Sequence, residues 1–194
     1  AAPWRTVSLE DFAASFGTTV DDIPPDCRQL IAHTDFRYRV LEGQERDRVM
    51  LDVLKRIEVD EQKIGAAERQ GVWEQGWSEN LRGFCEKGYD LNELTPRFFR
   101  SSQVIRLNRQ YVVPASPSFE LDYFYVFRLW LFRQYLRDAN AVYDFGCGTG
   151  YNLVALAELY PEKRLFGFDF VPSAVELVTT MVPASAINRT TWPT

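Results

Sequence analysis

Apolar positions recur at helical spacing through most of the first 137 residues. Ser8 to Asp11 is similar to a capping box, so a helix is predicted to begin there, and Gly17 can end it. Proline suits the first turn of a helix, so Pro24 and Pro25 predict the start of a second helix. The other amphipathic or apolar stretches, each predicted to form one helix, cover residues 42–64, 72–88 and 119–137.

The pattern changes to short apolar runs further along the chain. Residues 104–113 are predicted to be extended, and Ala141 to Phe145 and Leu165 to Phe168 predict two buried strands. Helices are predicted after each of these two strands, over 151–159 and 172–182. A strand, a glycine loop, a helix, a strand and a helix together indicate the start of a doubly wound parallel sheet. The predicted fold class is therefore α/β.

The chain is predicted to contain a mostly helical amino-terminal region, 1–117, and an incomplete α/β domain with its leading helix, 118–194. Ile187 and Trp192 suggest a third strand, but Pro183 and Pro193 argue against it, so a sheet of two parallel strands is expected. Such a ribbon is poorly stable, and its first strand has an open apolar edge. We expect that edge to be covered by the helical region, by a partner chain such as a second copy, or by the missing carboxy-terminal part of a longer enzyme.

Charge and composition narrow the function classes. The net charge of −5 gives no broad basic surface, so no nucleic-acid partner is expected. Three cysteines without CxxC spacing, together with the single His33, argue against a disulfide framework and a metal site, and they favour a reduced, cytoplasmic location. The apolar run over 124–132 is too short to cross a bilayer and no signal peptide is visible, so no membrane partner is expected.

The loop from Gly146 to Gly150 carries the candidate chemistry. Gly146 and Gly148 lack the Cβ atoms that would hold a ligand away, and they permit positive φ angles, while Gly150 lets a helix pack closely. The amides of the loop and of the following helix terminus are predicted to face the ligand. Asp169 should lie beside the loop, because adjacent parallel strands end at the same edge of a sheet. Its carboxylate can accept hydrogen bonds from both hydroxyls of a ribose.

Two other nucleotide-binding motifs fit less well. The dinucleotide fingerprint G-x-G-x-x-G places its third glycine at the position of Tyr151, so the sequence departs from the NAD pattern. The chain also lacks the G-x-x-x-x-G-K-[ST] pattern of a P-loop. An oxidoreductase that uses NAD or FAD remains an alternative, which Tyr151 disfavours.

Residues 142–150, followed by 167–170 and 173–176, resemble the first two motifs of class I S-adenosylmethionine-dependent methyltransferases. The resemblance covers residues 141–182 and includes the loop, both strands and both acids. It implies the first βαβα part of a Rossmann-like methyltransferase sheet and S-adenosyl-L-methionine as cofactor. The cofactor-binding residues that it implies are Asp144, Gly146, Cys147, Gly148, Gly150, Asp169 and Phe170.

The same resemblance implies a role for each of these residues. Gly146 and Gly148 would lie along the methionine part of the cofactor, and Cys147 would contact it through its backbone rather than act as a nucleophile. Asp144 would reach the amino group, directly or through water. In addition, Asp169 would bind the ribose hydroxyls, and its neighbour Phe170 would pack against the adenine.

The predicted function is therefore a methyltransferase, or its amino-terminal fragment, acting on an unidentified small-molecule acceptor. No catalytic residue is named, because the family usually places those residues after later strands and because transfer from a sulfonium needs mostly proximity. The aromatic side chains that could line an acceptor pocket, although ordinary core packing is favoured, are Tyr111, Tyr123, Tyr125 and Trp130. The alternative is a non-catalytic helical interaction module with an incomplete cofactor-binding half-domain.

Overall fold

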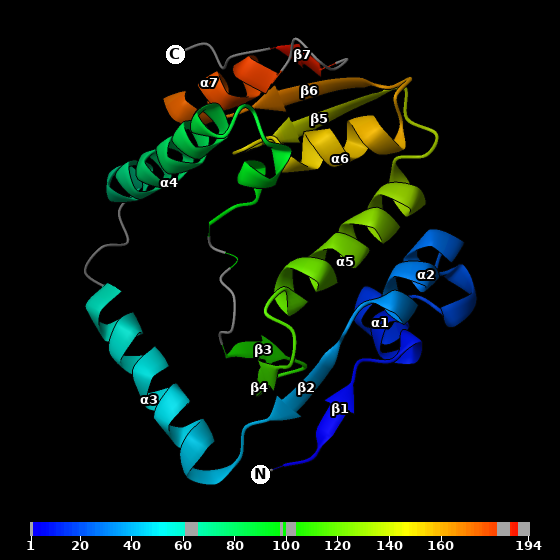
Figure 1. The fold of residues 1–194 in the computed structure, drawn as a ribbon, viewed down its shortest axis with the longest axis vertical. Helices are drawn as coiled ribbons and strands as arrows, with labels where there is room; N and C mark the ends of the chain where they lie inside the picture. Colours follow the sequence, from blue (N-terminus) through cyan, green and yellow to red (C-terminus); the bar gives the residue numbers. More distant parts are fainter. Residues whose placement is uncertain (1, 61–65, 98, 100–103, 182–186, 190–194) are drawn as a thin grey trace. The chain divides into compact units, whose positions relative to one another are not determined.

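The structure is a computed structural model that describes residues 2–60, 66–97, 99, 104–181 and 187–189. Helices and two sheets make the chain an α/β protein (Figure 1). It divides into two compact units, residues 1–62 with 99–137 and residues 63–98 with 138–194. This division differs from the predicted boundary between 117 and 118, because the helix over 119–135 packs in the first unit and the helix over 66–86 packs in the second.

The first unit contains helices and an antiparallel sheet. Its elements are β1 (Trp4–Thr6), α1 (Leu9–Phe16), η1 (Val20–Asp22), α2 (Pro25–His33), β2 (Arg37–Val40), α3 (Gly43–Asp60), β3 (Ile105–Leu107), β4 (Gln110–Pro114) and α5 (Phe119–Tyr135). The sheet has the order β1-β2-β4-β3, and each neighbouring pair is antiparallel. The description of this region as mostly helical therefore missed β1 and β2, which are too short to show a strand period.

The predicted helix limits in this unit follow from local capping. The Ser8 side chain accepts a hydrogen bond from the Asp11 amide at 3.1 Å, and the Asp11 carboxylate accepts one from the Ser8 amide at 2.9 Å. Gly17 ends α1 with a φ of 69°, a left-handed conformation that glycine adopts without strain. Both predicted limits of α1 are thus confirmed.

Aromatic side chains form much of the first unit's core. Phe12 is fully buried, and its ring stacks on that of Tyr123 with the centroids 4.7 Å apart. Trp130 is buried and stacks on Phe16 with the centroids 5.0 Å apart. Tyr123 and Trp130 therefore serve the core of this unit, as the interpretation favoured from the sequence expected.

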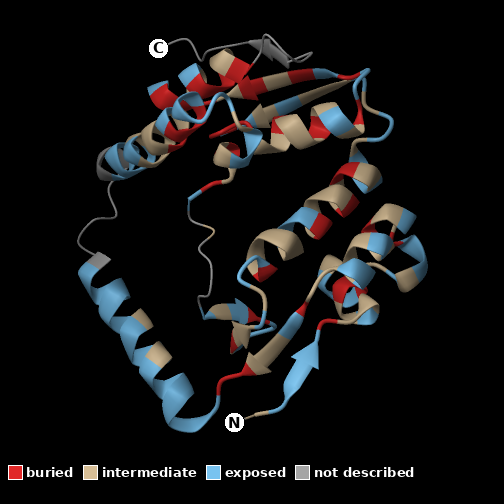
Figure 2. Ribbon diagram, in the orientation of Figure 1, coloured by how far each residue is buried: buried red, intermediate tan, exposed pale blue. Residues whose placement is uncertain are grey.

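The helix α3 presents its apolar residues to solvent. From residue 43 to residue 59 no residue of the helix is buried, and Figure 2 shows it almost entirely as exposed surface. Leu51, Leu54 and Ile57 are each at least half exposed. An apolar stripe at helical spacing normally faces a core, so this one is a surface on which something else can pack.

The second unit contains a parallel sheet with helices. Its elements are α4 (Ala66–Glu86), η3 (Leu91–Leu94), β5 (Ala141–Phe145), α6 (Tyr151–Leu159), β6 (Arg164–Phe168), α7 (Pro172–Met181) and β7 (Ile187–Arg189). Within the described ranges, β5, β6 and β7 form the sheet in that order, and both pairs are parallel. The predicted two-stranded sheet is therefore wrong. The third strand forms because it spans only three residues, which leaves both prolines outside its ladder.

The strand β5 has an open edge, as predicted. Among the described strands, only β6 pairs with it. Tyr143 and Phe145 are 53% and 64% exposed, and their rings stack on those of Phe166 and Phe168 with centroids 4.7 and 5.0 Å apart. These aromatic rings lie on one face of the parallel sheet, and that face is partly exposed to solvent. Parallel sheets are usually covered on both faces.

Candidate functional site

The loop between β5 and α6 adopts a tight turn that its glycines permit. The φ angles of Gly146, Gly148 and Gly150 are 78°, 53° and 73°, all in the left-handed region. A side chain at any of these positions would cost conformational energy, because its Cβ would crowd the backbone. The positive φ angles expected from the sequence are thereby confirmed.

The three glycines differ in what surrounds them. A Cβ on Gly148 would lie 3.0 Å from Cζ2 of Trp77, and one on Gly150 would lie 3.0 Å from Cγ2 of Val178. A Cβ on Gly146 would meet nothing within 4 Å. The loop is therefore closely covered at its second and third glycines and open at its first.

Most of the loop's amides donate hydrogen bonds inside the protein. The amides of Gly146 and Cys147 both donate to the Phe168 carbonyl, at 2.7 and 3.0 Å. The Gly148 amide donates to Oδ2 of Asp169 at 2.8 Å. The Gly150 amide donates to the Cys147 carbonyl at 2.9 Å. The prediction that the loop amides face a ligand is therefore wrong for these four, because the end of β6 accepts three of the hydrogen bonds and the loop itself accepts the fourth.

Asp169 lies beside the loop, as predicted from the parallel strand order. Its Oδ1 atom accepts a hydrogen bond from the Val171 amide at 2.9 Å, while Oδ2 accepts the bond from Gly148. The residue is 6% exposed. The carboxylate thus fastens the end of β6 to the loop, and a ribose hydroxyl would have to share its oxygens through their second lone pairs.

The environment of Asp144 disfavours the ionised form of its carboxyl group. Burial raises the pKa of its carboxyl group, a hydrogen bond from the Asn152 side chain opposes the rise, and the negative charge of Asp169 adds to it. No group among the described residues donates a hydrogen bond to its buried Oδ2 atom. An ionised carboxylate without a full set of donors is costly inside a protein, and a cation that approached it would relieve that cost.

The other two predicted site residues differ in accessibility. Cys147 is buried, and burial raises the pKa of its thiol to about 12, with the charges of Asp144 and Asp169 contributing. At neutral pH the thiol is therefore protonated and unsuited to nucleophilic attack. Phe170, in contrast, is 60% exposed just after the end of β6.

The sequence did not predict that α4 and η3 pack on the glycine loop. The Thr149 hydroxyl donates to the Leu94 carbonyl at 2.6 Å, across 55 residues of sequence. The Ser173 amide and hydroxyl, near the start of α7, donate to Oε2 of Glu74 at 3.3 and 3.2 Å, and α4 packs alongside α7 (Figure 1). The one signal in the sequence is the pair Trp73 and Trp77, one turn apart in α4, a spacing typical of core packing or of a helix–helix contact, which does not identify the partner.

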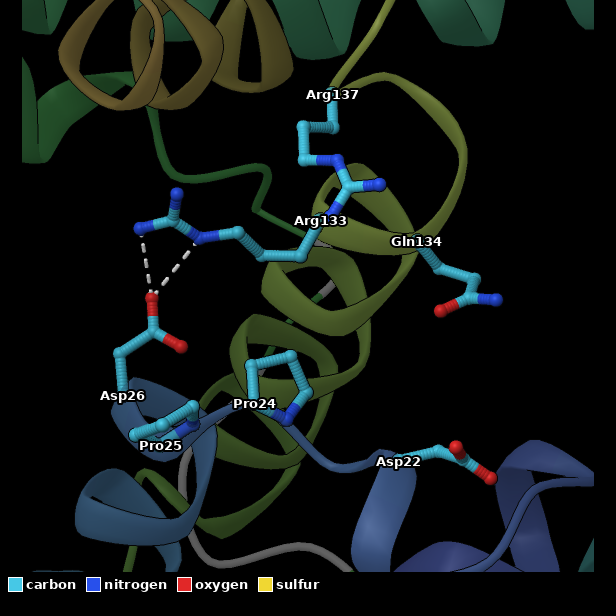
Figure 3. A pocket seen from close by; sticks show the side chains of 7 residues that line it. All are labelled: Asp22, Pro24, Pro25, Asp26, Arg133, Gln134 and Arg137. Carbon is cyan, nitrogen blue, oxygen red and sulfur yellow. Dashed lines mark hydrogen bonds and ion pairs between the residues drawn. The ribbon is translucent and has the colours of Figure 1, made fainter.

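The first unit has a cavity of its own, between η1 and α2 on one side and the end of α5 on the other (Figure 3). Its volume is about 540 Å³, and it is lined by Asp22, Pro24, Pro25, Asp26, Arg133, Gln134 and Arg137. Nε and Nη2 of Arg133 donate to Oδ2 of Asp26 at 3.1 and 2.9 Å. Two acids and two arginines balance in charge, so the lining selects neither an anion nor a cation.

No protein-family model matches this chain, and it matches no curated protein and no solved structure. In the part of the chain that the structure describes, every helix is too short or too polar to cross a bilayer.

Proposed function

We propose that the second unit binds S-adenosylmethionine and that the chain is a methyltransferase, or the amino-terminal part of one, acting on a small-molecule acceptor. The succession β5-α6-β6-α7-β7 in a parallel sheet supports a Rossmann-like half-sheet. One observation carries the proposal more than any other. The glycine loop has an open backbone at Gly146, and the Asp169 carboxylate accepts a hydrogen bond from the Gly148 amide of the same loop.

The arrangement of donors disfavours a phosphate-bearing ligand. Phosphates bind at glycine loops through backbone amides and helix amino termini. Here the Gly148 amide already donates to Asp169, and the Ser173 amide near the start of α7 donates to Glu74. A pyrophosphate would have to displace these carboxylates and approach their charges, which argues against NAD and FAD.

The same arrangement favours a ligand that carries positive charge. S-adenosylmethionine has a sulfonium and an ammonium group, and Asp144 has a buried oxygen to which none of the described residues donates. Binding of a cation would lower the raised pKa of Asp144 by stabilising its ionised form. Charge complementarity thus supports a sulfonium nucleoside over a dinucleotide.

Isothermal titration with S-adenosylmethionine, S-adenosylhomocysteine and NAD tests the proposal. The first two ligands should bind and NAD should not. Asp144→Asn keeps the size of the side chain and removes its charge, so it should weaken binding of S-adenosylmethionine by about tenfold or more. Glu158→Gln, which removes an exposed carboxylate from α6, is the matched control and should leave the affinity unchanged. Binding of NAD, or equal affinities for the two variants, would contradict the proposal.

The exposed stripe of α3 supports a second candidate, the non-catalytic interaction module. Leu51, Leu54 and Ile57 offer a partner helix an apolar surface that needs no cofactor. If the intact chain binds none of the three ligands, this second candidate is the one that stands.

A further inference from the structure

The indole ring of Trp77 lies directly on the glycine loop. Three atoms of its six-membered ring, Cζ2, Cε2 and Cη2, would lie 3.0 to 3.3 Å from a Cβ on Gly148. No side chain larger than hydrogen fits at that position without displacing the ring. Gly146, two residues earlier, is exposed, and a Cβ there would meet nothing within 4 Å. The ring therefore marks where the accessible part of the loop ends.

Hydrogen bonds hold α4 against α7 and hold the following η3 against the glycine loop. Glu74, one turn before Trp77, accepts hydrogen bonds from the Ser173 amide and hydroxyl. Beyond the end of α4, the Leu94 carbonyl of η3 accepts the hydrogen bond from the Thr149 hydroxyl, and both Leu94 and Thr149 are almost completely buried. The placement of the indole thus follows from contacts that involve the loop itself and α7.

We infer that Trp77 is a cofactor-binding residue, which bounds the sulfonium nucleoside on the Gly148 side while the ligand lies over Gly146. This inference rests on the proposed function. The indole gives the ligand an apolar wall that excludes water, and its π system attracts a neighbouring positive charge. The wall and the Asp144 carboxylate favour the same kind of ligand, one with an aromatic or apolar body and a cationic centre.

Trp73 offers a matched control within the same helix. Its ring stacks on that of Trp77 with the centroids 5.7 Å apart and an interplanar angle of 22°. It is 42% exposed, and it is not among the nearest atoms to any glycine of the loop. A change at Trp73 therefore removes an indole of the same helix without removing the wall at Gly148.

The experiment uses the intact chain with S-adenosylhomocysteine, followed by titration calorimetry and by tryptophan fluorescence. Trp77→Ala should weaken binding by about tenfold, and Trp73→Ala by less than about twofold. Trp77→Phe keeps an aromatic wall, so it should recover most of the affinity but lose most of the ligand-induced fluorescence change. Trp73→Phe should keep that change.

The outcomes separate the inference from the proposed function. If the wild-type chain binds neither S-adenosylmethionine nor S-adenosylhomocysteine, the proposed function fails and the inference fails with it. If the wild type binds but the Trp77 and Trp73 variants have equal affinities, the inference alone is overturned. Should Trp77→Ala fail to fold, the fluorescence of the two phenylalanine variants decides, and a ligand-induced change that survives in Trp77→Phe overturns the inference.

Discussion

Gly150→Ala should destabilise the second unit more than any comparable change in the loop. The residue has a φ of 73°, and a left-handed backbone costs a residue with a Cβ about 1–2 kcal/mol. The new Cβ would also lie 3.0 Å from Cγ2 of Val178 and overlap the end of Met181. Overpacking of this kind costs about 1–3 kcal/mol. The expected total loss is therefore about 2–5 kcal/mol.

Gly146→Ala is the matched control for the backbone contribution. Its φ of 78° is similar, but nothing lies within 4 Å of the added Cβ. This change should cost only the conformational part, about 1–2 kcal/mol. Urea unfolding, together with hydrogen exchange of the amides of β5 and β6, measures both variants in the unit that they affect.

A double-mutant cycle identifies the atom responsible. When Met181→Ala is already present, Gly150→Ala should cost about 1 kcal/mol less than it does alone, because the overlapping side chain has gone. If Gly150→Ala and Gly146→Ala destabilise the unit equally, α7 does not pack on the loop as closely as described, and the reasoning is refuted.

Two further substitutions and one labelling experiment test other parts of the structure. Ser8→Ala removes the cap of α1 and should cost about 1 kcal/mol in urea unfolding, and no loss would contradict the capping geometry. Burial raises the pKa of Asp144 in the folded state above its ordinary value of 3.8. The protonated carboxyl group therefore favours folding when the pH is below 3.8, and the ionised group opposes folding as the pH rises through the raised pKa. Asp144→Asn should therefore become more stable relative to the wild type as pH increases, and a pH-independent difference would argue against a raised pKa. The pKa values of the buried Cys27 and Cys147 are about 12, so iodoacetamide at neutral pH should modify the exposed Cys85 alone. Mass spectrometry of the labelled chain checks this result. Labelling of Cys147 would show that the loop opens.

The features that depend on local chemistry were predictable from the sequence. The capping pair of Ser8 and Asp11 and the start of α2 at Pro25 depend on neighbours within one helical turn. The positive φ angles of the loop glycines and the placement of Asp169 beside the loop follow from a strand–loop–helix pattern. These predictions hold because the interactions that produce them join residues close in sequence or fixed by parallel strand order.

The tertiary structure alone decided which groups surround the loop. Hydrogen bonds across 55 and 99 residues of sequence bring Leu94 and Glu74 to the loop and α7, and the same docking places Trp77 on Gly148. The short strands β1, β2 and β7 likewise acquire their identity from partners far along the chain. No spacing pattern encodes such pairings, because their energy comes from surfaces that meet only after the chain has folded. The sequence therefore determined the positive φ angles of the glycine loop, whereas tertiary packing determined that the Trp77 indole and the Asp169 carboxylate contact that loop.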